Sequence, residues 1–124
     1  MKQDYPYIEF QPEDERITVS NAALRLIGEP SGIRFLWNSA KRSLVIEPAD
    51  ADDPNRIEVE PEIYEQNMSF VIHSFALTTE IFNDIDDAFE FCFRIVAKYY
   101  EPSNLAIFDM ERATKHETSS DYTY

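Results

Sequence analysis

Runs in which apolar and polar residues alternate predict the longer β-strands of this chain. Ile, Phe and Trp alternate with Arg and Leu in residues 33–37, and Phe and Ile alternate with Glu, Cys and Arg in residues 89–96. A period of two is typical of a strand because successive side chains point to opposite faces of a sheet. Shorter apolar or β-branched runs predict further strands at residues 16–19, 43–46, 57–59, 70–72 and 105–108.

Two serines mark the starts of two short helices. Ser20 precedes an alanine- and leucine-rich stretch that ends at Gly28, and Ser74 precedes a similar stretch, residues 75–82. A serine hydroxyl can accept a hydrogen bond from a free N–H group of the first helical turn, and glycine readily adopts the left-handed conformation that ends a helix. Strand, helix, strand and strand therefore follow one another twice along the chain.

The recurring order predicts an α+β fold of two tandem β-α-β-β units, residues 16–46 and 70–108, with mostly antiparallel strands and short helices. A true internal repeat and a chance recurrence of the same elements both fit the pattern. Residues 1–114 are expected to form one domain, in which Ile8 and Phe10 belong to an edge strand. Residues 115–124 show no apolar period and are expected to be a disordered tail.

The composition indicates that the protein is acidic and intracellular. The net charge of −13 opposes binding to phosphate backbones and anionic membranes, and the single cysteine excludes an intrachain disulfide. The N-terminus has no apolar signal segment, and no run of about 18 apolar residues is present. We therefore expect a cytoplasmic protein that is not bound to a membrane.

The charge is unevenly distributed, and this suggests a binding surface. Residues 16–46 contain five basic side chains against one acidic residue, Glu29, a local charge of +4. These side chains are the candidate site for DNA or an acidic partner: Arg16, Arg25, Arg34, Lys41 and Arg42. The alternative is that they are solvated residues that pair with the acidic half of the chain.

The same segment resembles the AbrB-type swapped-hairpin domain. It has a strand from Arg16 to Val19, a two-turn helix that ends at Gly28, a strand from Ile33 to Trp37, a polar turn and a strand from Leu44 to Ile46. The resemblance implies two interlocked units, with residues 70–108 in place of a second chain, and a function as a transition-state regulator or antitoxin. It also implies that Arg16 and Arg25 contact DNA.

The chain departs from that family in three respects. Ser20 stands where a proline usually follows the first strand, the second unit is acidic, and the total charge is more negative than a DNA-binding protein needs. The strings at residues 27–30 and 35–38 also resemble uncharacterised small proteins of Clostridia-like bacteria, a resemblance that implies no function.

Candidate catalytic and metal-binding residues are few, and each has a structural interpretation. Asp50, Asp52 and Asp53 begin like a calcium loop, but Asn55 and Pro61 stand where the loop needs glycine and glutamate. An acidic turn explains Asp84, Asp86 and Asp87. The remaining candidates are expected to be structural: His73 and His116 lack a second ligand or catalytic partner, and Cys92 alternates with core phenylalanines. Neither a metal nor a cofactor is predicted.

The aromatic residues are expected to form the core rather than a surface for stacking bases. These residues are Phe35, Trp37, Phe75, Phe89, Phe91 and Phe93. The leading hypothesis is therefore a non-enzymatic, AbrB-like regulatory protein, monomeric or homodimeric, whose basic first unit binds DNA or an acidic partner. The alternative is an acidic protein-interaction module, an adaptor or inhibitor that binds no nucleic acid. An enzyme or ligand carrier would require a concave polar pocket.

Overall fold

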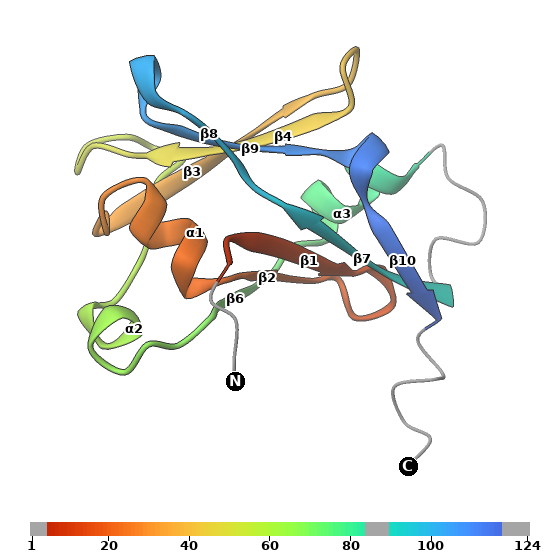
Figure 1. Cartoon of the computed structure of the whole chain (residues 1–124), viewed down its shortest axis with the longest axis horizontal. Coiled ribbons are helices and arrows are strands. Elements are labelled where there is room, and N and C mark those ends of the chain that lie inside the picture. Colours follow the sequence, from red (N-terminus) through yellow and green to blue (C-terminus); the bar gives the residue numbers. More distant parts are fainter. Residues whose placement is uncertain (1–4, 84–89, 118–124) are drawn as a thin grey trace.

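The computed structural model describes residues 5–83 and 90–117, whose strands form two antiparallel sheets (Figure 1). The first sheet has the order β10 (Thr114–Glu117), β7 (Phe91–Val96), β1 (Tyr7–Gln11), β2 (Arg16–Val19) and β6 (Phe70–His73). The second sheet has the order β5 (Ile57–Glu58), β3 (Gly32–Asn38), β4 (Ser43–Pro48), β9 (Leu105–Asp109) and β8 (Lys98–Tyr100). The predicted α+β class with antiparallel strands is confirmed.

The helices are short, as the sequence predicts. They are α1 (Asn21–Leu26), α2 (Pro61–Glu65) and α3 (Phe75–Phe82), with 3-10 turns η1 (Pro12–Asp14), η3 (Glu101–Ser103) and η4 (Met110–Arg112). The Ser20 hydroxyl accepts from the N–H of Ala23 at 3.1 Å, and the Ser74 hydroxyl accepts from the N–H of Leu77 at 3.1 Å. Gly28, with φ of 95°, follows α1. Both predicted N-caps are therefore confirmed.

The core lies between the two sheets, with α1 and α3 inserted at its sides (Figure 1). Phe10 of the first sheet and Phe108 of the second are fully buried. The ring of Phe82, from α3, lies 5.4 Å from Phe10 and 4.9 Å from Phe93 between ring centroids. Each fully buried side chain of this size contributes about 2–3 kcal/mol of hydrophobic stabilisation. The core therefore joins strands from both predicted units.

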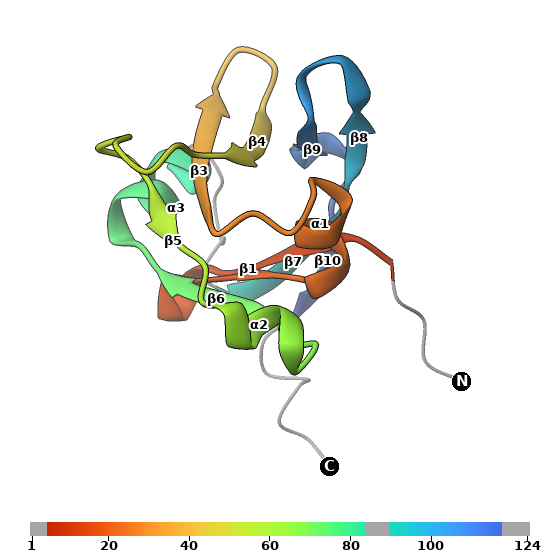
Figure 2. The same ribbon diagram turned by 90° about the vertical axis from the view of Figure 1, so that its left-hand side faces the viewer.

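The order strand, helix, strand, strand occurs twice, as β2-α1-β3-β4 and as β6-α3-β7/β8-β9. The first strands pair with each other, with Ile17 opposite Ile72, and the last strands pair with each other, with Leu44 opposite Phe108. Figure 2 shows the two resulting hairpins, β3–β4 and β8–β9, standing side by side. The units differ at the third strand, because β3 lies wholly in the second sheet whereas the chain from β7 to β8 crosses between sheets.

Three expectations need correction. The strand that contains Ile8 and Phe10 is not an edge strand, because β1 lies between β7 and β2. Residues 115–117 are not part of a disordered tail, because they complete β10 and pair with β7. Phe75 is 67% exposed, since it begins α3 on the outer side.

The other expected core aromatics have mixed outcomes. Phe93 is buried, and Phe35, Trp37 and Phe91 are half-buried against the core. Phe89 and the Asp84, Asp86 and Asp87 cluster lie outside the described residues, as do residues 118–124 of the expected tail.

Candidate functional site

The three arginines of the predicted basic surface already have acidic partners. Arg34 lies 2.5 Å from a carboxylate oxygen of Glu47 and 3.1 Å from one of Asp53, and the hydrogen bond with Glu47 is the main cause of its raised pKa. Arg25 lies 2.6 Å from Glu29. Arg16 lies 3.8 Å from Asp14. Local carboxylates therefore neutralise much of the charge that the sequence assigns to binding.

Arg25 also serves as a structural brace. Its guanidinium donates to the side-chain oxygen of Asn21 and, over 2.9 Å, to the backbone carbonyl of Tyr64. Asn21 in turn donates to the carbonyls of Ile63 and Met68 at 2.8 and 2.9 Å. These bonds fasten α1 to the α2 segment, so Arg25 has a structural function whatever else it contacts.

Lys41 and Arg42 differ from the three arginines. They occupy the turn between β3 and β4, and neither forms an ion pair with a carboxylate in residues 5–83 and 90–117. The backbone carbonyl of Arg42 accepts from the N–H of Met110 at 2.9 Å, which places this turn beside η4. The five predicted residues therefore do not form one continuous surface: two lie on one turn, and the others lie on β2, α1 and β3.

A groove lies where the two arms of the second hairpin separate. In the β8–β9 pair, Lys98 lies opposite Ile107. If the same register continued along the hairpin, Arg94 would lie opposite Glu111. In the β7–β10 pair, Arg94 instead lies opposite Thr114. The difference of three residues equals the length of η4, which is inserted in the second arm. The arms cannot stay paired across this insertion, so they separate between Val96 and Asp109.

Local interactions stabilise the inserted turn. The Asp109 carboxylate accepts from the N–H of Glu111 at 3.0 Å, and the N–H of Ala113 donates to the carbonyl of Met110 at 3.2 Å. Met110 is buried in the core, with 7% of its surface exposed. Burial of Met110 and capping by Asp109 therefore hold the second arm away from the first.

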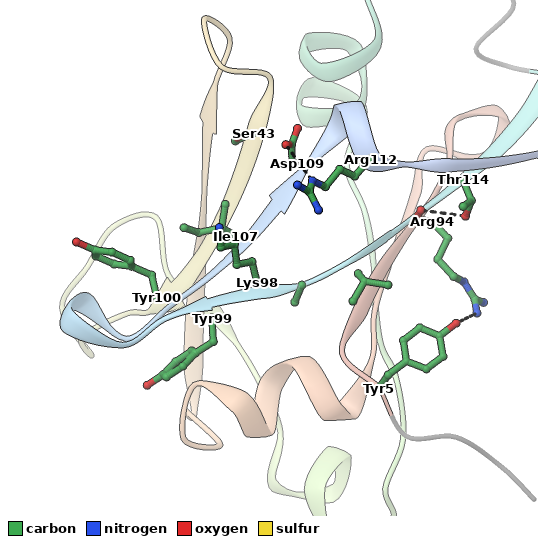
Figure 3. A pocket seen from close by; sticks show the side chains of 12 residues that line it. Tyr5, Ser43, Arg94, Lys98, Tyr99, Tyr100, Ile107, Asp109, Arg112 and Thr114 are labelled. Atoms are coloured by element: carbon green, nitrogen blue, oxygen red, sulfur yellow. Dashed lines mark hydrogen bonds and ion pairs between the residues drawn. The ribbon is translucent and has the colours of Figure 1, made fainter.

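The groove is an open hollow of about 1080 Å³ (Figure 3). Its lining combines basic, aromatic and aliphatic side chains with one carboxylate: Tyr5, Ser43, Arg94, Val96, Ala97, Lys98, Tyr99, Tyr100, Ile107, Asp109, Arg112 and Thr114. Small-molecule sites are commonly about 300–1,000 Å³ and enclosed. The size and openness of this groove suit a chain segment better than a small molecule.

The three cations of the groove differ in how firmly they are held. Arg94 lies 2.7 Å from Glu9, donates to the Tyr5 hydroxyl at 3.1 Å and stacks 4.0 Å from the ring centroid of Tyr7. Burial by itself would lower the pKa of Arg94, but the hydrogen bonds to Glu9 and Tyr5 outweigh it and raise the pKa above the ordinary value. Arg94 is therefore held in place, and Glu9 neutralises much of its charge.

Lys98 and Arg112 are more available to a ligand. Lys98 is exposed and forms no ion pair with a carboxylate of the described chain, and Arg112 is 84% exposed and 3.8 Å from Asp109. An exposed pair at that distance contributes little to stability, so Arg112 can exchange Asp109 for another carboxylate at small cost. The groove can therefore bind anionic groups beside an apolar floor that includes Val96 and Ile107.

Local sequence patterns do not predict this groove. Arg94, Lys98 and Arg112 lie in a chain half with an acidic total, and a local charge count gives no sign that they converge. The apolar run at residues 105–108 ends at Asp109 and gives no sign that the second arm continues into another strand.

The other candidate residues show no catalytic arrangement in the part of the chain that the structure describes. Asp53 accepts from Arg34 and, at 2.8 Å, from the N–H of Asn55, so it organises its loop. His73 is exposed beside a shallow second hollow of about 530 Å³. Cys92 is buried and accepts from the side-chain amide of Gln11 at 3.5 Å. His116 pairs through β10 with Cys92 in the sheet register.

Across residues 5–83 and 90–117, no three His, Cys, Asp or Glu side chains converge in a way that could hold a metal ion. Within the same residues, every helix is too short or too polar to span a bilayer. Comparison with protein-family models, curated proteins and solved structures found no match for this chain. The interpretation of the groove therefore depends on its own geometry.

Proposed function

We propose that this chain is a non-enzymatic protein-interaction module that binds a segment of a partner protein in the groove between the separated hairpin arms. The observation that carries the proposal is the combination of accessible cations, Lys98 and Arg112, with an apolar floor. Protein interfaces use such a combination, because apolar contact supplies affinity and charge supplies orientation and specificity.

Three features favour a protein partner over DNA. The net charge of −13 repels a phosphate backbone. Arg16, Arg25 and Arg34 have carboxylate neighbours in the chain itself. The floor of the groove is apolar, and phosphates offer nothing to bury against it. The acidic interaction module therefore becomes the leading function, without nucleic-acid binding.

We also propose that the two β-α-β-β units form an AbrB-like pseudo-dimer. Support comes from the recurring β-α-β-β order, the pairing of β2 with β6 and the pairing of β4 with β9. The strands β1, β5 and β10 lie outside the two units: β5 and β10 extend the sheets at their edges, and β1 lies between β7 and β2. In this proposal the second unit replaces a partner chain, and its altered hairpin supplies the groove.

DNA binding is the second candidate, and the turn between β3 and β4 is the feature that favours it. Lys41 and Arg42 lie together there without ion pairs to described carboxylates, beside the turn that carries Arg112. A fluorescence-anisotropy titration of duplex DNA at low salt tests this candidate. Binding that falls with added salt and is lost in the K41E/R42E variant would establish it.

Affinity purification with purified variants tests the protein-interaction proposal. Tagged wild-type protein is expected to retain a stoichiometric protein partner without nucleic acid, and the K98E/R112E variant is expected to lose that partner. The K41E/R42E variant undergoes the same change in charge outside the groove and is expected to keep it. Equal losses from both variants would show that the groove is not the binding site.

A further inference from the structure

The outer edge of β6 is open among the described residues. The strand ends the first sheet and pairs there with β2, and Figure 2 shows it on the opposite side of that sheet from β10. The N–H of Ser74 donates to the carbonyl of Glu15 at 2.9 Å, which continues the ladder towards β2. In an antiparallel ladder, alternate residues direct their N–H and C=O groups to the same side. Val71 and His73 therefore direct their backbone groups outward, where the described chain has no further strand.

The outer strands of the two sheets differ in how well they are protected against pairing with another chain. Lys115 lies on β10, Lys98 lies on β8, and β5 has two residues, one of them Glu58. Short strands and charged side chains are common ways in which proteins protect a sheet edge. The four residues of β6, from Phe70 to His73, include no Lys, Arg, Asp or Glu. The edge of β6 is therefore the unprotected one in the described sheets.

Exposed apolar side chains follow the same edge. Met68 is 44% exposed, Val71 46% and Phe75 67%. They lie before, within and after β6, so the apolar surface extends beyond both ends of the strand. The hollow of about 530 Å³ adjoins this strand, with Ile72 and His73 among its lining residues. An open strand edge with apolar side chains along it is a surface for pairing with another chain.

The sequence of β6 is complementary to itself. When two copies pair about a two-fold axis that passes beside Ile72, Val71 of each copy lies opposite His73 of the other. Because both residues direct their backbone groups outward, each opposed pair exchanges both of its N–H···O=C bonds. Antiparallel pairing also brings the start of one strand beside the end of the other, so Met68 of one copy approaches Phe75 of the other. Both exposed apolar ends of the edge are then covered.

The net charge of the chain favours this edge over the rest of the surface. Two chains of net charge −13 repel each other in most orientations, because carboxylates then face carboxylates. Within the paired β6 strands no like charges are opposed, since the strand contains no acidic or basic residue. A second copy therefore fits this edge.

We infer that two copies of this chain pair through the outer edges of β6 and form a homodimer, in which the two first sheets continue into each other across the two-fold axis. The main-chain bonds of Val71 and His73 hold the strands together, and Ile72 contacts its own copy at the axis. This surface lies apart from the groove between the hairpin arms, so the inference does not depend on the proposed function.

Sedimentation velocity of the full chain at increasing protein concentration tests the dimer. Wild type is expected to change from monomer to dimer as the concentration rises. Added salt is expected to strengthen the dimer, because it screens the repulsion between two acidic chains. A chain that stays monomeric at every concentration, or one that associates less as salt is added, would overturn the inference and leave the edge to a strand of another protein.

Two lysine substitutions with equal charge changes locate the interface. Val71→Lys is expected to weaken the dimer at least about tenfold, since it places a charge on the pairing edge without a carboxylate opposite. Leu36→Lys changes a residue of similar exposure, 43%, on β3 inside the second sheet and is expected to leave the dimer unchanged. Both variants are less negative than wild type, so a general charge effect would favour association in both. Circular dichroism checks that both remain folded. Equal dimerisation of the two variants would contradict the assignment.

Cysteine cross-linking tests the register of the pairing. At the two-fold axis the copies of residue 72 form a non-hydrogen-bonded pair, whose Cα atoms lie about 4.5 Å apart in antiparallel strands. This separation is within the range for a disulfide, so Ile72→Cys is expected to form a covalent dimer under mild oxidation. Val71→Cys places the two cysteines at diagonal positions about 7–8 Å apart and is expected to cross-link more slowly. Wild type, with Cys92 buried, gives the background. Faster cross-linking of Val71→Cys would overturn the proposed register.

Discussion

The two hairpins of this molecule follow the same order of elements but differ in their strand register. The hairpin of β3 and β4 keeps one register throughout, from Ile33 opposite Pro48 to Asn38 opposite Ser43. The second hairpin changes register by the length of η4, and its arms reach into both sheets. The β3–β4 hairpin stays within one sheet, whereas the arms of the second hairpin separate and line a groove.

Their charged residues differ in the same way. Arg34, on the β3–β4 hairpin, forms ion pairs with two carboxylates. Lys98, on the second hairpin, has no ion pair with a carboxylate in the described ranges. A continuous ladder brings cross-strand partners such as Arg34 and Glu47 together, and a break in the ladder removes such partners. Among the described residues, the interruption in pairing therefore leaves Lys98 without the cross-strand carboxylate that Arg34 has.

The largest effect is expected where the two units share one core. Phe108→Ala removes a fully buried ring opposite Leu44 and should lower the free energy of unfolding by about 3–5 kcal/mol. Urea unfolding can be followed by far-ultraviolet circular dichroism and by the fluorescence of Trp37, the single tryptophan, which lies in the first unit. Both signals should shift together. An unchanged Trp37 transition would mean that the units fold independently.

The two helix caps provide a matched pair of smaller effects. The Ser20 hydroxyl accepts from the N–H groups of Ala23 and Tyr7, whereas the Ser74 hydroxyl accepts from that of Leu77. Ser20→Ala should cost about 2 kcal/mol, because it removes the acceptor of the Tyr7 N–H as well as the helix cap, and Ser74→Ala should cost about 1 kcal/mol. Chemical denaturation of both variants measures the difference. Equal costs would show that the bond to β1 contributes nothing.

The contact between Tyr64 of α2 and the loop after α1 should appear in the pH dependence of stability. Burial, with a smaller contribution from Glu29, raises the pKa of Tyr64 to about 12, and its hydroxyl donates to the carbonyl of Pro30. The folded state therefore holds this proton more tightly than the unfolded state, whose pKa is about 10. The resulting stabilisation is complete below pH about 10 and is lost as the pH rises to about 12.

Denaturation of wild type and Tyr64→Phe at several alkaline pH values measures this contribution. The difference in stability between the two proteins should shrink across that range, since the variant lacks the ionisable group. A constant difference would contradict a raised pKa. The other tyrosines are present in both proteins, so their effects cancel.

The smallest effect is expected at the groove itself. The K98E/R112E variant should change the free energy of unfolding by less than about 0.5 kcal/mol, because both side chains are exposed and neither forms a close ion pair with a described residue. Arg94→Ala should cost more, since it removes the partner of Glu9. Thermal or urea denaturation compares the two. Equal stability losses would show that the groove cations are structural.

Much of the local structure follows from short stretches of sequence. The alternation at residues 33–37 and the caps at Ser20 and Ser74 predict the elements that the structure contains. The predictions are wrong where the environment of a residue depends on segments that are distant in the sequence. Ile8 and Phe10 have the pattern of a strand but give no sign that β7 will cover the second edge of β1. Phe75 is apolar, yet its position at the start of α3 leaves it exposed.

By itself, the sequence determined the α+β class, the short helices with their serine caps and the recurring order of elements, because these depend on interactions within a few residues. The tertiary structure decided which charges are neutralised and which line a groove. Arg94 meets Glu9, 85 positions away, and Asp109 approaches Ser43 because β4 and β9 are neighbours. Such contacts depend on which strands pair and in what register, and the packing of the whole core selects both.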